Sequence, residues 1–223
     1  DQCVAEKNDA ILLGAISADG LNSKIEQVRR QGIHVIDLVN GVTSTSVSAR
    51  SLVSFEEMGT RCAESILAST SSQSDTGNIA WFPGPKGANW VLDGDRGVST
   101  VLSKNNISIV HVAYGDTGFK TQSGLINSAL DETSLNILAG TAVSAEIGVK
   151  LLKQRKLNTS IKVFSYDMTP GVFRQIKRGQ LVSSPTDYPV IQGRIAVDQA
   201  IRLLENEMVM KHVGPKIDLI HQQ

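Results

Sequence analysis

The chain has 223 residues, 41% hydrophobic and 20% charged, which is typical of a globular chain with one large or two small domains. Its 22 basic residues balance its 22 acidic residues and are scattered, so the sequence argues against a surface that follows nucleic-acid phosphates. No apolar run approaches the roughly 20 residues of a membrane span, and the opening DQCVAEKND is unlike a signal peptide.

Short apolar runs alternate with amphipathic segments at the spacing of strand–helix–strand units in parallel sheets. The predicted strands cover 9–17, 34–40, 78–83, 107–115, 136–141, 161–167, 181–184 and 216–220. The predicted helices cover 21–31, 56–68, 88–103, 120–132, 142–154, 169–178 and 189–206. A polar loop is expected at 69–77. The first strand lacks the strands that should pair beside it, so we expect one sheet to be incomplete and an N-terminal part of a larger protein to be missing.

The two cysteines, Cys3 and Cys62, fit either one disulfide or two buried thiols. Cys62 shares one helical face with Met58 and Ile66, which favours a buried thiol. Cys3 is therefore the better candidate for half of a disulfide, with a partner in this chain or outside it.

Ligands of open parallel sheets bind beyond the carboxyl ends of the strands. The residues predicted to lie there are Asn40, the 83–90 loop with Trp90, Tyr114, Asp116, Thr141, Tyr166, Asp167, Asp187 and Tyr188. All three tyrosines and one of two tryptophans thus fall at strand exits, although aromatic residues pack most readily inside strands. This bias is the strongest functional signal in the sequence.

The second tryptophan, Trp90, lies in a polar loop that leads into a helix, so we predict that it forms a pocket wall. Trp81 lies within an apolar strand and is predicted to be a core residue. Aromatic faces beside a carboxylate are suited to alkylated ammonium groups. Two structural alternatives stay open, because Asp167 is also placed to cap the helix that starts near Thr169 and Asp116 to hold its own turn.

Motifs of catalysis are missing from the sequence. It contains no nucleophile elbow, phosphate loop or zinc-protease helix, so we expect no enzymatic activity, no cofactor and no metal. His34, His111, His212 and His221 lie on different elements at spacings unlike a metal site. The run LDGDRG at 92–97 departs from a calcium loop and is interpreted as helix surface.

The ordered series DAILLG, HVIDLVNG, SFEEMG, PGPKGAN, AGTAVSAEIG, FSYDMTPGVFRQIKRGQL and QGRIAVDQAI resembles the type I periplasmic binding proteins over nearly the whole chain. The resemblance implies an α/β fold with two Rossmann-like lobes, parallel sheets and a three-stranded hinge, closing on a ligand held between the lobes. It places residues 1–54 and 188–215 in an incomplete N-terminal-type lobe. Residues 55–187 and 216–223 would form the other lobe.

The match is strongest to members of this family that report trimethylamine N-oxide to the periplasmic sensor domain of a membrane histidine kinase. This implies ligand contacts at Asn40, Trp90, Tyr114, Asp116, Thr141, Tyr166, Asp167 and Asp187, a periplasmic location and no membrane insertion. Sugar-binding relatives place Arg or Asp at the site of Asn40 and Arg in the helix after the Pro-Gly-Pro loop. Asn40 and Leu92 supply neither, which favours a small ligand that forms few hydrogen bonds.

Three classes of function remain open at this point. The leading interpretation is a ligand-responsive partner of a histidine kinase. The alternatives are a solute-binding protein of a transporter and the effector domain of a transcription repressor, because the same fold serves all three.

Overall fold

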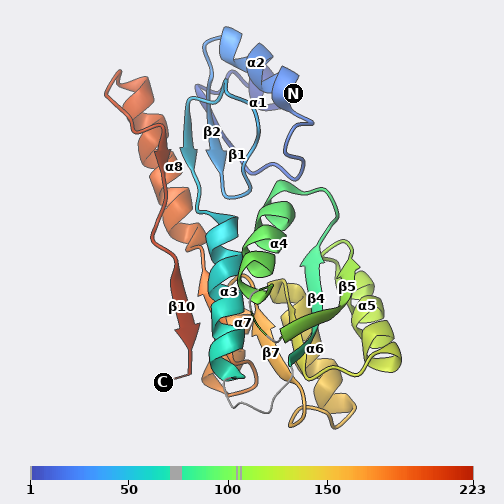
Figure 1. Cartoon of the computed structure of the whole chain (residues 1–223). Helices are drawn as coiled ribbons and strands as arrows, with labels where there is room; N and C mark the ends of the chain where they lie inside the picture. The colour runs from blue at the N-terminus through green and yellow to red at the C-terminus, as the bar shows by residue number, and fades with distance from the viewer. Residues whose placement is uncertain (1, 71–76, 104, 106, 223) are drawn as a thin grey trace. The chain divides into compact units, whose positions relative to one another are not determined.

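A computed structural model of the chain describes residues 2–70, 77–103, 105 and 107–222. Most of the polar loop predicted at 69–77 therefore lies outside the described residues. Strands alternate with helices in the described part (Figure 1). The strands are β1 (Ala10–Leu13), β2 (His34–Leu38), β3 (Ala49–Ser51), β4 (Gly77–Gly84), β5 (Ile107–Tyr114), β6 (Ile137–Gly140), β7 (Lys162–Ser165), β8 (Ser183–Thr186), β9 (His212–Val213) and β10 (Asp218–His221). The helices are α1 (Gln2–Ala5), α2 (Asn22–Arg30), α3 (Phe55–Ser69), α4 (Asn89–Leu102), α5 (Phe119–Glu132), α6 (Ala142–Gln154), α7 (Pro170–Lys177) and α8 (Pro189–Leu204).

Every strand and helix predicted from the sequence is present, with ends that shift by a few residues. Three short elements were missed, namely α1, β3 and β9. Each has only two to four residues, which is too short to show a hydrophobic period. The strand predicted at 181–184 begins two residues later, at Ser183.

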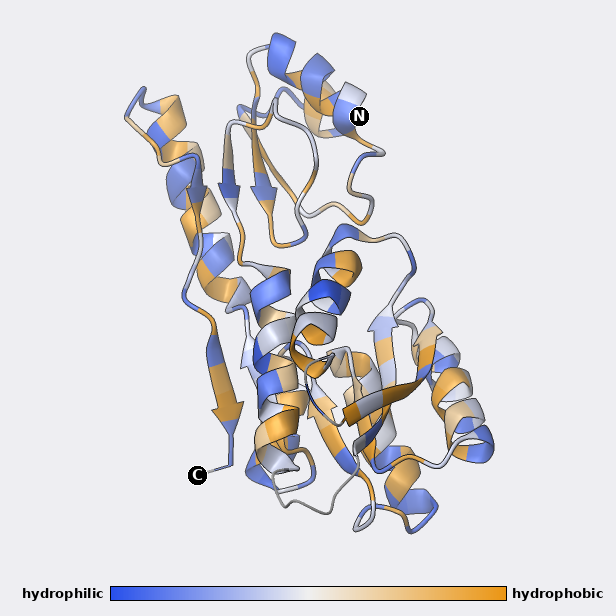
Figure 2. Ribbon diagram, viewed as in Figure 1, coloured by the Kyte–Doolittle hydropathy of each residue, from blue (hydrophilic) through white to orange (hydrophobic). Residues whose placement is uncertain are grey.

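The first sheet has the order β1-β2-β3-β9, and all its strands are parallel. Its second strand, β2, is buried on both faces, and its successive side chains pack on opposite sides of the sheet. Val35 packs in one apolar cluster with Ile25 of α2, while Ile36 packs in another with Ala196 of α8. Figure 2 shows hydrophobic and hydrophilic residues alternating along α8, as expected for a helix that covers a sheet with one face.

The second sheet has the order β10-β8-β7-β6-β4-β5. Its strands are parallel except β10, which runs antiparallel to β8 and so departs from the all-parallel expectation. The apolar cluster of this sheet includes Phe82 of β4, Leu138 of β6 and Ile147 of α6. None of the described helices is long and apolar enough to cross a membrane.

The chain divides into two compact units. Unit 1 comprises residues 1–53, 88–90 and 187–216, and unit 2 comprises 54–87, 91–186 and 217–223. The lobe limits inferred from the sequence stay a prediction, and they differ from the two units chiefly at 88–90, which they place with residues 55–187.

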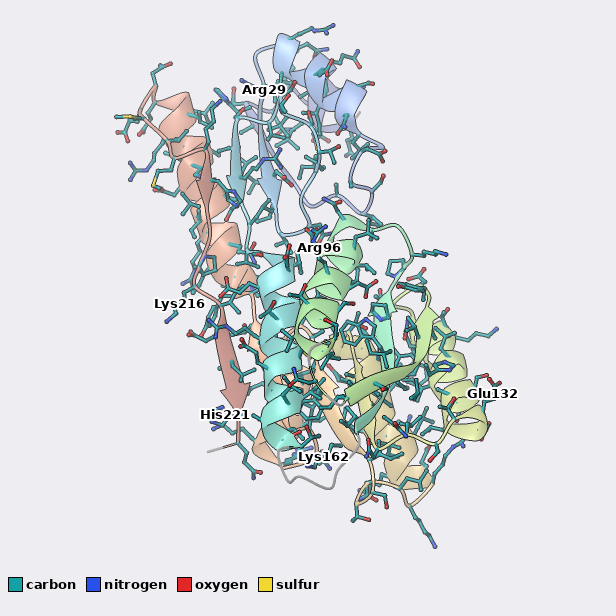
Figure 3. All side chains as sticks on the ribbon, in the orientation of Figure 1. Arg29, Arg96, Glu132, Lys162, Lys216 and His221 are labelled. Carbon is teal, nitrogen blue, oxygen red and sulfur yellow. The ribbon has the colours of Figure 1, made fainter. Side chains whose placement is uncertain are left out.

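Within unit 2, helices α3 and α4 lie side by side (Figure 1). Their backbones approach so closely that a Cβ atom on Gly97 of α4 would lie 2.0 Å from the carbonyl oxygen of Glu56, and one on Gly59 of α3 would lie 2.3 Å from that of Gly94. Arg96, labelled in Figure 3, joins the two helices by a 2.9 Å ion pair from its Nε to Glu56 Oε2. Glycine is therefore required at this contact for steric reasons.

Both cysteines are free thiols, so no disulfide joins Cys3 to Cys62. Cys3 is exposed on α1, and Cys62 is buried on α3. Burial raises the pKa of the Cys62 thiol to about 12, with a further contribution from the negative charge of Asp167. The prediction of a buried thiol at Cys62 is confirmed.

Candidate functional site

The carboxyl edge of the first sheet carries Asn40, in the turn that follows β2. The Nδ2 atom of Asn40 donates a 2.9 Å hydrogen bond to the carbonyl oxygen of Ala15, in the segment after β1. Gly41 has a φ of +77°, a left-handed conformation that glycine adopts without steric cost. Asn40 is half-buried and is tied to the neighbouring strand exit.

Asp187 also belongs to unit 1, directly before α8. It is 7% exposed, and Gln192 donates from Nε2 to its carbonyl oxygen at 2.7 Å and to its Oδ2 at 3.2 Å. Ser51, at the end of β3, donates to the carbonyl oxygen of Gln192 at 2.8 Å. Burial raises the pKa of Asp187, and its hydrogen bonds oppose this rise. Ser51 thus attaches the start of α8 to the sheet, and Asp187 holds the side chain of Gln192 within that first turn.

Trp90 lies in the first turn of α4 and is half-buried. The loop that leads to it contains Gly84 at φ +114° and Gly87 at φ +89°, both in a region that side chains rarely adopt. The Pro-Gly-Pro-Lys-Gly segment therefore reverses the chain after β4 and presents Trp90 at the start of the helix.

Helix α4 carries a carboxylate that lies between an aromatic residue inside β4 and one at the end of β5. Asp95 of α4 accepts from Trp81 Nε1 through Oδ1 at 2.7 Å and from the Tyr114 hydroxyl through Oδ2 at 2.8 Å. Trp81 is 2% exposed, which confirms its predicted core position, whereas Tyr114 is 39% exposed. The hydrogen bond to Asp95 is the main reason why the pKa of Tyr114 is raised, and burial adds to it.

This arrangement corrects the interpretation of LDGDRG as helix surface. Gly94 and Gly97 are buried against other elements, and Asp95 binds two aromatic side chains. The signal was available in the sequence, because two glycines three residues apart in a helix indicate a close approach by another backbone. The two partners of Asp95 were not evident from the sequence.

Tyr166 lies in the core of unit 2. It is 1% exposed, its ring meets that of Trp81 edge-on at 5.8 Å, and the ring of Phe55 lies 6.2 Å away. The hydroxyl is so close to Gly94 that a Cβ atom there would lie 2.4 Å from it. Burial, followed by the charge of Asp167, raises the pKa of Tyr166 well above its usual value. The structure therefore places this ring under α4, in contact with Trp81.

Thr141 and Asp167 both serve the N-terminus of α6. Thr141 accepts from the backbone N–H of Ser144 at 3.3 Å, and Asp167 Oδ1 accepts from that of Ala142 at 2.7 Å. The alternative in which Asp167 caps the helix near Thr169 is not what the structure shows, because Thr169 caps α7 itself by accepting from Val172 N–H. The aspartate instead caps the helix that follows the adjacent strand, where its charge favours the helix dipole.

A buried glutamine joins the exits of β5 and β6. Gln122 is fully buried and donates to the carbonyl oxygens of Gly115 and Asp116 at 3.2 and 2.8 Å. Its Oε1 accepts from the Ser144 hydroxyl at 2.9 Å, and this hydroxyl is 2.7 Å from that of Thr141. The side chain of Asp116 is exposed. Sequence reasoning missed Gln122 because it lies within an ordinary amphipathic helix.

The structure thus gathers the predicted residues into two sets, one in each unit. Asn40, Trp90 and Asp187 belong to unit 1. The set in unit 2 consists of Tyr114, Asp116, Thr141, Tyr166 and Asp167. Among the described residues there is no group of three metal-ligating side chains. The donor set instead contains aromatic rings, amides, hydroxyls and carboxylates, which suits an organic ligand.

Comparison with known proteins identifies the family of the chain. The family profile described as "Periplasmic binding protein domain" matches residues 1–208. The periplasmic protein TorT of Escherichia coli K12 is 30% identical over 218 residues, which cover 97% of this chain and 62% of TorT. The chain therefore spans about three fifths of the length of this curated relative.

Solved structures show the same fold. An ABC transporter solute-binding protein from Bradyrhizobium sp. BTAi1 with bound bis-Tris is 42% identical, with a TM-score of 0.83 over 99% of this chain and 66% of that one. The complex of TorT with the TorS sensor domain in the absence of ligand includes a chain that is 22% identical, with a TM-score of 0.88 over 99% of this chain and 75% of that one. The chain belongs to the family of periplasmic binding proteins, with the type I fold.

Proposed function

We propose that this protein binds a small ligand with an alkylated nitrogen in the periplasm and reports binding to the sensor domain of a membrane histidine kinase. Trimethylamine N-oxide is the ligand to test first. The proposal is supported by the family and by the 30% identity with TorT. A solved TorS sensor domain–TorT complex in the presence of this N-oxide names the partner and the ligand of that relative.

The observation that carries the ligand class is the exposed ring of Tyr114 beside the carboxylate of Asp95. The nitrogen of trimethylamine N-oxide is formally positive, and its methyl groups cannot form strong hydrogen bonds. Aromatic faces and a nearby carboxylate both favour such a group. Tyr114 supplies an accessible ring for this purpose, because 39% of its surface is exposed. Tyr114 is therefore preferred as an aromatic wall over Tyr166, which is buried.

Trp90 and Asn40 of unit 1 stay predicted contacts of the ligand, Trp90 through its aromatic face and Asn40 through a hydrogen bond to the oxygen of the N-oxide. The side-chain amide of Asn40 carries two N–H groups, and Ala15 accepts from this nitrogen. Asp116, Thr141, Asp167 and Asp187 stay predicted contacts. The last three already hold helix ends in place, which would make them supports for the site as well.

Calorimetric titration of the purified protein with trimethylamine N-oxide, ribose and glycine betaine tests the proposal. Trp90→Ala is expected to weaken N-oxide binding by about 0.5–2 kcal/mol, or about two- to thirtyfold in Kd, and Trp90→Phe to restore much of the loss. Phe173→Ala removes an exposed aromatic ring of α7 and is the matched control, with no expected effect. Binding of ribose without the N-oxide would refute the ligand class.

A second candidate function is solute capture for a transporter. It is favoured by the 42% identity with the solute-binding protein of an ABC transporter. The bis-Tris bound to that protein has an alkylated nitrogen in common with trimethylamine N-oxide, but it also carries several hydroxyl groups. Co-purification with a histidine kinase sensor domain, in the presence and absence of ligand, separates them. Retention of the sensor domain supports signalling, and failure to bind it in either condition supports transport.

A further inference from the structure

The turn after β2 contains a backbone outlier. Val39 has a φ of +66°, and the backbone N–H of Asn40 donates to the carbonyl oxygen of Leu38 at 2.8 Å. A three-residue turn with its central residue in the left-handed region is rare and strained. A β-branched residue makes it more unfavourable still, because its Cβ substituents crowd the backbone. Strain of this kind persists only when the surrounding structure imposes it.

An ion pair between a buried aspartate and a partly buried arginine holds the next residues of the same loop. Asp37, in β2, is completely buried, and its Oδ2 accepts from Val42 N–H at 2.9 Å and from Arg50 Nη1. Arg50, in β3, also donates from Nη1 to the carbonyl oxygen of Val42 at 2.7 Å and from Nη2 to that of Ser44 at 2.6 Å. The guanidinium of Arg50 thus connects β2 and β3 to the loop that follows β2.

The pair is poorly explained as a contribution to stability alone. Ion pairs with a buried partner often add little net stability over apolar side chains of similar size, because the buried charge, here Asp37, loses its hydration. Among the described residues, Asp37 Oδ1 has no hydrogen-bond partner, which adds to this cost. The other bonds of the pair end on loop backbone at Val42 and Ser44. What the pair supplies is therefore the position of the loop.

We propose that Asp37 and Arg50 are positioning residues for the ligand, holding the strained turn at Val39 so that Asn40 is fixed before the ligand arrives. This role rests on the proposed function of Asn40. Fixing a loop in its bound conformation strengthens binding, because less conformational freedom is lost when the ligand binds. Two further hydrogen bonds hold the turn. Asn40 Nδ2 donates to the carbonyl oxygen of Ala15, and the backbone N–H of Val39 donates to the carbonyl oxygen of Ser51 at 3.1 Å.

The test replaces the pair by apolar side chains, as Asp37→Leu with Arg50→Met, and measures amide hydrogen exchange without ligand. We expect about tenfold faster exchange at the amides of Asn40, Val42 and Thr43, with little change in the melting temperature. The matched control is Asp131→Asn with Arg155→Gln, which removes an exposed ion pair of unit 2 and should leave these amides unchanged. Affinity for trimethylamine N-oxide, and for bis-Tris as a second probe, is expected to fall about tenfold in the apolar variant.

The two measurements separate the possible failures. If the unaltered protein binds neither probe, the proposed function is wrong, and exchange at the loop alone decides whether the pair positions it. Unchanged exchange overturns the inference, as does global unfolding of the apolar variant, since the pair would then be purely structural. Arg50→Lys provides a second variant that keeps the charge but lacks the planar fork. It should loosen the same amides while the fold remains intact.

Discussion

The contact between α3 and α4 gives the sharpest stability prediction, through Gly97→Ala. A Cβ atom at residue 97 would lie 2.0 Å from the carbonyl oxygen of Glu56 and 2.8 Å from the backbone nitrogen of Thr60. Both atoms are backbone of a well-packed helix and cannot rotate away. To restore ordinary van der Waals contact, the helices must separate by about 1.4 Å, which loses packing along the whole contact.

The magnitude follows from two opposing effects. Overpacking of a well-packed core costs about 1–3 kcal/mol, and more where backbone must move. Alanine favours a helix over glycine by about 1 kcal/mol, which offsets part of this cost. We therefore expect Gly97→Ala to lower the free energy of unfolding by about 2 kcal/mol. For a chain of this size the melting temperature should fall by about 4–8 °C.

Gly124→Ala is the matched control, because it makes the same chemical change within α5. A Cβ atom there meets no atom within 4 Å, so only the helix preference acts. We expect a gain of about 1 kcal/mol and a rise of about 2–4 °C in the melting temperature. Calorimetry or circular dichroism of both variants beside the unaltered protein is the assay. If Gly97→Ala melts at or above the unaltered protein, α3 and α4 do not pack as closely as described.

Two further predictions concern titrating groups. Thiol labelling of the native protein at neutral pH should modify Cys3 and spare Cys62, because Cys62 is buried and its pKa is about 12. The unfolded protein should be labelled at both cysteines. Rapid labelling of a native Cys3→Ser variant would contradict this prediction. Burial raises the pKa of Asp187, so the folded state binds this proton more tightly than the unfolded state does. The cost of ionising Asp187 therefore grows as the pH rises from the ordinary aspartate pKa of 3.8 through the folded pKa. Asp187→Asn should therefore raise the melting temperature at pH 7 but have little effect at pH 3; an equal shift at both values would show that ionisation is not the cause.

Hydrophobic patterns in the sequence are sufficient to predict the longer elements and the faces that they bury, but not the short α1, β3 and β9. Alternation of side chains along β2 required both faces to be covered, since Val35 and Ile36 are apolar and point in opposite directions. The mid-strand position of Trp81 predicted its burial, and strand ends located Tyr114 and Asn40 at the carboxyl edges. These features are local, so the hydrophobic period and the turn residues are sufficient to predict them.

The hydrogen-bond and ion-pair partners of the polar side chains depend on the tertiary structure. Asp95 meets Tyr114 only because β4, β5 and α4 pack together, and Asp37 meets Arg50 only through the register of β2 with β3. Tyr166 also lies at a strand end, yet packing under α4 buries it. Hydrogen bonds and ion pairs require atoms to meet within about 3–4 Å. Residues distant in sequence reach that separation only through the sheet register and helix packing, which no local pattern encodes.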